Sequence, residues 1–479
     1  MPDSTAVPEE DALRRAAIDR SVRFPVLFFF TSAAAWLLVS VVLGFVQSMK
    51  LHSPEFLDTP WLFFLNYGRS NPAFMTALVY GWAIQAGFGV SVWLMARLCR
   101  VEVKNGVTLI VAGHFWNLGV LLGFLGILAG YGTTMEWMAF PKAIWPILFV
   151  AYSLIVVWQL TMFHRRERGE EYVSTLYLLG ACFWFPWVFL TANVFIHVLP
   201  GDGLAKAATN SWFVGTMILL VLAPVALAAT YYFIPKILGR PVYSSQLCGI
   251  GFWGIAIIGG WTGMQKFIGG PLPAALPALS GAAAILLLIP VFAIAVNHHL
   301  TTRGHHHVIA HSPTMRFVAT GAFAFTGYGI LNAASSLFGL GALAQLSQSN
   351  LALQLLAVYG FFTMVMFGAI YFIVPRLVGC EWPSAGRINR HFWFSVYGGL
   401  ALVLLHYVGG LWQSMSYAQF DAPLENAVAA GRPYAIGSSV AWGFIILSNL
   451  AFLYHLSLMV FRLGRKSDEP TLIGQPHHA

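Results

Sequence analysis

Histidine is the residue type in this sequence that could hold a haem iron or a metal ion inside a membrane. A haem with two histidine ligands needs two imidazoles that face each other across one iron. Four histidines fall within strongly apolar segments but at two different depths: His114 and His455 toward one end, His197 and His406 toward the other. A single histidine in a helical bundle more often forms a hydrogen bond to a neighbouring helix. We therefore predict structural roles for these four histidines.

Two further groups of metal-ligating residues also fail to make a recognisable site. Six histidines cluster between the eighth and ninth apolar segments: His298, His299, His305, His306, His307 and His311. They could bind Zn, Cu or Ni. Neither a carboxylate nor a cysteine completes a site there, so we predict a solvated loop. The four cysteines are scattered and form no C-x-x-C-H motif for a covalently bound haem: Cys99, Cys182, Cys248 and Cys380.

Gln265 and Lys266 are the polar pair that ends the second of two apolar segments between residues 212 and 266. A lysine inside a membrane is a functional candidate, but one this close to a helix end can extend its side chain to water. We predict that the Lys266 side chain extends to water. The alternative is that this side chain closes a pocket that has lost its ligand. The eighteen acidic residues are expected in tails, loops or interfaces. This distribution argues against an ion-coupled transporter or a proton pump, which usually carry carboxylates in the membrane.

The elements that must position these residues are membrane-spanning helices. The chain has 479 residues, of which 58% are hydrophobic and 9% charged, and its mean hydropathy is +0.72. These values predict an all-α integral membrane protein, with no partner role for nucleic acid despite a net charge of +8. Hydropathy predicts twelve spans: 24–48, 72–96, 107–132, 139–163, 173–197, 211–235, 247–268, 274–297, 314–340, 351–375, 391–415 and 434–461.

Charge predicts the orientation of the spans. Lys and Arg recur in alternate connections, and the positive-inside rule places those connections, with both termini, in the cytoplasm. We expect a cytoplasmic tail at 1–23, a membrane domain at 24–461 and a second cytoplasmic tail at 462–479. The opposite face carries the longer loops 49–71, 198–210 and 416–433, where a periplasmic partner would dock.

Several sequence runs are similar to those of one family. They comprise YYFIPK, GRPVYS and GFW between residues 231 and 253, Tyr67-Gly68-Arg69 before Pro72, EWMAFP at 136–141, Met315-Arg316-Phe317, FGAIYFIVP at 367–375, and HFW at 391–393. Together they resemble subunit I of the cbb-type heme-copper oxidases, relatives of the nitric oxide reductases. The resemblance covers most of the chain and implies a twelve-transmembrane-helix bundle of the heme-copper oxidase subunit I type.

The resemblance also implies where the family's cofactors would bind. Its low-spin haem ligands fall on Phe74 and Leu355, and its high-spin haem ligand falls on Leu353. The three copper ligands fall on Gly215, Gln265 and Lys266, the active-site tyrosine on Gly259, and a glutamate that the family carries in span nine on Leu331. None of these residues is an ordinary ligand of haem iron or copper. The pair His298-His299 copies the family's copper motif but lies at the other end of a different span.

We therefore expect a cofactor-free, non-catalytic homologue with no catalytic, haem or metal site. It would act as a membrane anchor or organising subunit beside a c-type cytochrome or a periplasmic redox partner in the inner membrane of a bacterium. Bulky side chains, tilted helices, lipid or quinone would fill the former haem cavities. Two alternatives remain open: an oxygen or nitric oxide reductase with relocated haem ligands, and a channel or carrier for a small neutral solute or quinone.

Overall fold

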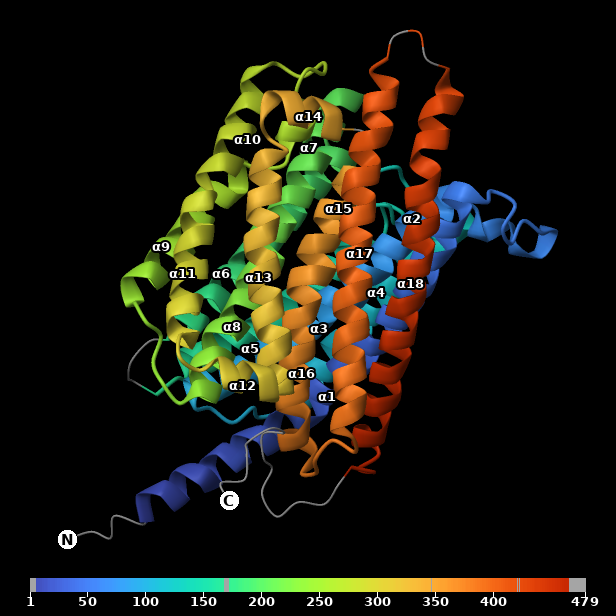
Figure 1. Cartoon of the computed structure of the whole chain (residues 1–479). Coiled ribbons are helices and arrows are strands. Elements are labelled where there is room, and N and C mark those ends of the chain that lie inside the picture. Colours follow the sequence, from blue (N-terminus) through green and yellow to red (C-terminus); the bar gives the residue numbers. More distant parts are fainter. Residues whose placement is uncertain (1–5, 168–171, 346, 420, 422, 465–479) are drawn as a thin grey trace.

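The fold is an all-helical bundle. A computed structural model describes residues 6–167, 172–345, 347–419, 421 and 423–464. Within these ranges twelve helical stretches are long and apolar enough to cross a membrane. They lie side by side in one bundle, from which the hairpin of α17 (Ala385–Tyr417) and α18 (Leu424–Val460) extends at one end (Figure 1). The predicted fold class and the predicted number of spans are confirmed.

Nine of the spans form the outside of the bundle. They are α1 (Ala6–His52), α4 (Val107–Ala129), α5 (Trp145–His164), α6 (Val173–Asn193) with its π-helical end η3 (Val194–Val198), α9 (Ser245–Ile258) with the 3-10 turns η5 (Gly259–Trp261) and η6 (Met264–Phe267), α10 (Ala275–Leu286) with α11 (Leu288–Thr302), α13 (Pro313–Ala334), α17 (Ala385–Tyr417) and α18 (Leu424–Val460). Short helices in the connections are η1 (Pro60–Leu65), α12 (His306–His311) and α14 (Phe338–Ala344).

Three spans form the core. They are α2 (Tyr67–Thr76), η2 (Ala77–Ala83) and α3 (Ile84–Cys99); α7 (Gly203–Thr216), η4 (Met217–Leu222) and α8 (Ala223–Leu238); and α15 (Gln348–Leu355), η7 (Leu356–Thr363) and α16 (Met364–Val378). In the most apolar 18-residue stretch of each of these spans, 100%, 89% and 94% of the residues are buried, against 39–50% in the other nine spans. A helix that is apolar on all sides must be surrounded by protein or lipid, and these three are surrounded by the other helices.

Each core span contains a π-helical turn, and side chains bond to the backbone groups of these turns. The Trp82 indole in η2 donates to the Thr363 hydroxyl in η7 at 2.7 Å. That hydroxyl donates in turn to the carbonyl of Val358, five residues earlier, at 2.8 Å. The Trp116 indole of α4 donates to the Tyr80 carbonyl in η2 at 2.9 Å. These bonds join the π turns η2 and η7 to each other, and join η2 to the outer helix α4.

The structure extends several predicted elements. The helix predicted to begin at residue 24 already begins at Ala6, and Asp19 is buried within it rather than in a solvated tail. Asp19 accepts a hydrogen bond from the Trp93 indole at 3.0 Å and lies 3.5 Å from Arg97. The predicted loop 416–433 is mostly the start of α18 at Leu424. Hydropathy marks only the part of a helix that crosses hydrocarbon, so it missed these extensions. Most of the predicted tail 462–479 lies outside the described residues.

Close packing between α1, α2 and α18 gives a direct test of the core. Trp442 is 1% exposed, and a methyl group added at Gly44 would lie 2.7 Å from its ring. We predict that Gly44→Ala destabilises the purified protein by about 1–3 kcal/mol, because the large ring has to move. Gly443→Ala is the matched control, since nothing lies within 4 Å of the added atom. A thermal melt should show a lower midpoint for Gly44→Ala only, and equal melts would contradict the packing.

Candidate functional site

A group of bonded polar residues lies at one end of the bundle, opposite the basic connections. The turns after α3, α5, α8, α11 and α16 lie at the basic end. Each has an arginine in it or directly beside it: Arg100, Arg165, Arg240, Arg303 and Arg387. The other end contains the connections after α4 and α9. There Glu136, Gln265 and Lys266 meet Asn332 of α13 and Gln354 of α15. These five residues are called the polar cluster below.

Glu136 is the charged centre of the polar cluster. Its carboxylate lies 3.5 Å from the Lys266 ammonium and accepts a hydrogen bond from the Gln354 amide. The Trp137 indole donates to the other end of that amide at 2.7 Å. We predicted that the Lys266 side chain extends into water. It is 23% exposed, and its ammonium forms an ion pair with Glu136. Partial exposure leaves this pair screened, and its contribution to stability is small.

Gln265 organises the buried half of the cluster. Its side-chain carbonyl accepts hydrogen bonds from the Gly263 backbone N–H and from the Ser280 hydroxyl, both at 2.6 Å. Its side-chain amide nitrogen donates to the side-chain oxygen Oδ1 of Asn332 at 3.3 Å. The Ser211 hydroxyl of α7 donates to the Gly263 carbonyl at 2.7 Å. One buried amide therefore connects the turn after α9 to α10 and α13.

Gly215 of α7 packs directly on the backbone of the same turn. A Cβ atom on Gly215 would lie 2.9 Å from the Cα atom of Gly263 and 3.1 Å from the carbonyl carbon of Thr262. Gly263 has φ +110°, and a Cβ atom there would lie 2.3 Å from the Ser211 carbonyl oxygen. Only glycine fits at both positions, because the obstacle is backbone rather than a movable side chain.

A single small cavity joins the residues at which the family resemblance places copper and the high-spin haem. Its lining includes Gly215, Gln265, Lys266 and Leu353, beside Tyr328 and Gln354. Its volume is about 20 Å³. That volume accommodates about one water molecule. The structure therefore brings four of the predicted site residues together, as the resemblance implies, around a space that is nearly closed.

The remaining predicted positions are packed against side chains. Phe74 is fully buried and meets the Trp442 ring edge to face at 5.3 Å between centroids. Leu355 is 2% exposed. A Cβ atom on Gly259 would lie 3.0 Å from the Leu220 side chain. Leu331 is half-buried in α13.

The four predicted structural histidines lie on separate helices. His114 is exposed, stacks on Phe28 at 4.6 Å and bonds to the Ile110 carbonyl at 2.8 Å. His197 is half-buried in η3, whereas His406 and His455 are buried in α17 and α18. Across the part of the chain that the structure describes, no three His, Cys, Asp or Glu side chains are grouped to hold a metal ion.

The histidine-rich segment is only partly the solvated loop that we predicted. His298 and His299 belong to α11, and His306 to His311 form α12. His298 is 7% exposed and packs on the Tyr231 ring at 4.6 Å, so the prediction was wrong for this residue. His299 is exposed at the end of the helix. Because the last turn of α11 continues past the hydrophobic run, one of its faces still points into the bundle.

Sequence reasoning missed three residues that the structure singles out. Gln354 and Asn332 belong to the polar cluster, and a polar residue inside an otherwise apolar run was the available signal for both. His391 at the start of α17 is 1% exposed, and its ring bonds to the Tyr371 hydroxyl at 2.9 Å. It escaped notice because it stands at a predicted span boundary.

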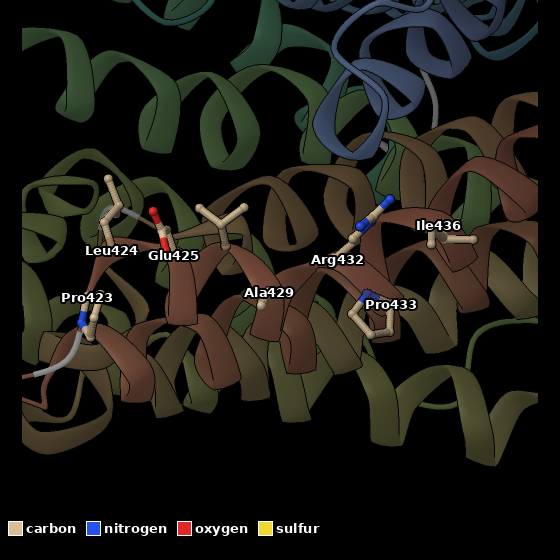
Figure 2. Close-up of a pocket in the computed structure, with 8 residues that line it drawn as sticks. Pro423, Leu424, Glu425, Ala429, Arg432, Pro433 and Ile436 are labelled. Carbon is tan, nitrogen blue, oxygen red and sulfur yellow. The ribbon is translucent and has the colours of Figure 1, made fainter.

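The long hairpin offers a groove to the outside at the end that carries the polar cluster. Pro423, Leu424, Glu425, Val428, Ala429, Arg432, Pro433 and Ile436 line a space of about 650 Å³. Figure 2 shows these side chains along one helix, α18. Leu424 and Val428 are 62% and 54% exposed, and the charged residues Glu425 and Arg432 line the same groove.

The sequence also identifies the family. Residues 24–445 match the family described as Cytochrome C and Quinol oxidase polypeptide I. With twelve apolar spans this defines a multi-pass membrane protein of the heme-copper oxidase subunit I class. The chain belongs to this family.

Its similar relatives are bacterial. It is 23% identical to a cytochrome c oxidase subunit 1 homolog of Agrobacterium tumefaciens, over 95% of this chain and 86% of the relative. It is 25% identical to the Cbb3-type cytochrome c oxidase subunit CcoN1 of Stutzerimonas stutzeri, over 81% and 83%. A solved structure, described as a heme-copper terminal oxidase dimer, shares the fold with TM-score 0.68 at 15% identity, over 95% of this chain and 87% of that one.

The residues at the implied cofactor positions do not fit haem or copper. At the copper position the chain offers a glycine without room for a side chain, an amide whose oxygen already accepts two hydrogen bonds, and an ammonium paired with Glu136. Copper prefers imidazole or sulfur, and haem iron prefers histidine, methionine, cysteine or tyrosine. Leu353, Leu355 and Phe74 carry no donor atom, so no reaction step through these groups follows from this chain.

We predict that Gln265→Leu destabilises the protein by about 1–3 kcal/mol, because it leaves the Gly263 N–H and the Ser280 hydroxyl buried without their partner. The control is Gln246→Leu, whose side chain is exposed at the start of α9 and should change stability by less than about 0.5 kcal/mol. Thermal unfolding in detergent measures both. If the two variants melted alike, the amide would not hold this end of the bundle together.

Proposed function

We propose that this chain is a non-catalytic member of its family that holds no haem or copper and serves as a membrane anchor or organising subunit for redox partners. The single observation that carries the proposal is the backbone contact between Gly215 and Gly263. It occupies the place where the resemblance puts a copper-binding imidazole.

The local packing supports this proposal beyond the loss of ligands. The cavity beside Gly215 is about 20 Å³, and Gln265, which lines it, bonds to both Asn332 and Ser280. A deleted cofactor would leave a space that costs stability in proportion to its volume. Here a backbone contact and a hydrogen-bonded amide take up that space, so the bundle has no need of the cofactor for its packing.

The outer surface supports the anchoring role. The segment before α2 carries Trp61 and Phe63, which are 87% and 61% exposed, and the groove on α18 adds Leu424 and Val428. Exposed aromatic and apolar groups of this kind are typical of surfaces that contact another protein or the membrane interface. The relatives are named as cytochrome c oxidase subunits, so a c-type cytochrome or another periplasmic redox subunit is the partner that we propose.

Haem and metal analysis of the purified full-length chain tests the first half of the proposal. We expect no Soret band, and iron and copper well below one atom per chain by mass spectrometry of the metals. Purification from native membranes tests the second half, since a haem-staining c-type cytochrome should co-purify. One haem per chain would overturn the non-catalytic role, and purification without any redox protein would overturn the anchoring role.

A ligand-restoring variant tests the observation itself. We predict that Gly215→His, combined with Gln265→His and Lys266→His, fails to bind one copper ion per chain and lowers the melting midpoint. The histidine at 215 would meet backbone atoms at about 3 Å. The double variant without the change at 215 is the matched control for the loss of the polar pair. Stoichiometric copper in a triple variant that melts like the double one would show that the contact at Gly215 yields.

A further inference from the structure

A cavity with charged walls lies at the basic end of the bundle, far from the polar cluster. It encloses about 810 Å³ between the start of α1, the end of α3, the start of α6, and the α8–α9 hairpin. Six cationic side chains line it: Arg14, Arg15, Arg97, Arg100, Lys236 and Arg240. This cavity is called the basic pocket below, and nothing in the proposed function uses it.

The basic pocket has more positive charge than the carboxylates that pair with its cations neutralise. Asp11 pairs with Arg15, Asp19 with Arg97, and Glu167 with both Arg14 and Arg100. The hydrogen bond from Arg14 and the charge of Arg100 lower the pKa of the Glu167 carboxyl, so it stays ionised and its one charge is divided between two arginines. Among the described residues, three carboxylates therefore pair with four of the six cations.

Lys236 and Arg240 are the cations that have no carboxylate partner among the described residues. Arg15, Arg97 and Arg376 repel the Lys236 ammonium. The Arg240 guanidinium lies 3.4 Å from the His305 ring nitrogen and 3.4 Å from the Arg303 carbonyl oxygen. Two cations held in one concave site without a counter-charge favour the binding of a multivalent or phosphate-type anion.

One wall of the basic pocket is apolar and faces away from the core. Leu176 of α6 is 38% exposed, and Trp253 of α9 is 61% exposed. Both spans lie on the outside of the bundle, with 44% and 39% of their most apolar windows buried. Phe252 and Val242 continue this wall toward the cations. A soluble anion would gain nothing from contact with this apolar wall, whereas the acyl chain of a lipid can pack along it.

We propose that the basic pocket binds the phosphate headgroup of an anionic phospholipid, with Lys236 and Arg240 holding the phosphate and an acyl chain lying along Leu176 and Trp253. The position suits this ligand, because Lys236 and Arg240 lie at the last turn of α8 and just beyond it, where a span leaves the hydrocarbon layer. Basic pockets between helices at this depth recognise acidic lipid headgroups. A free phosphate shares the headgroup chemistry but not the apolar contact.

The test uses the full chain in mild detergent, with native mass spectrometry and thermal melts as readouts. Phosphatidylglycerol, phosphatidylcholine and inorganic phosphate are added separately. We expect phosphatidylglycerol to be retained at one molecule per chain and to raise the melting midpoint, and the other two to do neither. Lys236→Gln combined with Arg240→Gln should weaken phosphatidylglycerol binding about 10-fold or more.

Lys104→Gln combined with Arg390→Gln is the matched control. Both residues are exposed at the basic end and lie outside the pocket lining, and the change in net charge is the same. The control should bind phosphatidylglycerol like the unmodified chain. Equal weakening in both double variants, equal retention of phosphatidylcholine, or full stabilisation by inorganic phosphate alone would each overturn the proposal.

Discussion

The contact of α7 with the turn after α9 is the constraint on which the rest of the site depends. Gly215 and Gly263 meet backbone to backbone, and neither position tolerates a Cβ atom. This approach lets Ser211 bond to the Gly263 carbonyl and lets Gln265 bond to the Gly263 N–H. Once those bonds form, the amide of Gln265 has one direction left, toward Ser280 and Asn332. The close approach of the two glycines thus positions Gln265, the buried member of the polar cluster.

The same constraint underlies our proposal that the chain keeps the family fold without the family's haem and copper chemistry. Membership and the bundle architecture rest on the long apolar spans and their order, which the chain keeps over residues 24–445. Haem and copper chemistry would rest on a few donor atoms and on open space inside the core. Phe74 packs on Trp442 instead, and the space beside Leu353 holds about one water. Under our proposal, fold and function have parted within one family without loss of the scaffold.

The sequence predicted the bundle well because length and hydropathy determine which segments can cross a membrane. Through the register of the resemblance it also assigned Gly215, Gln265 and Lys266 to copper positions and Leu353 to a haem position, and these four residues line one small cavity. It did not predict that Glu136 pairs with Lys266, since a loop carboxylate has no periodic pattern that reveals its partner. It likewise missed the burial of His298 and Asp19. Both lie in helices that continue beyond the apolar run, and tertiary contacts rather than hydropathy decide which of their faces is covered.

The π turns in the three core spans change which face of the helix each residue lies on. A π turn uses one residue more than an α turn for the same hydrogen-bonded loop, so everything after it is out of phase by about 100° with the pattern before it. Phe74 and Gly215 precede such turns, and the residues from Ile84 and Ala223 onward follow them. A helical wheel drawn through either span would assign the two halves to wrong neighbours. The azimuth of any side chain introduced there has to be counted from its own side of the turn.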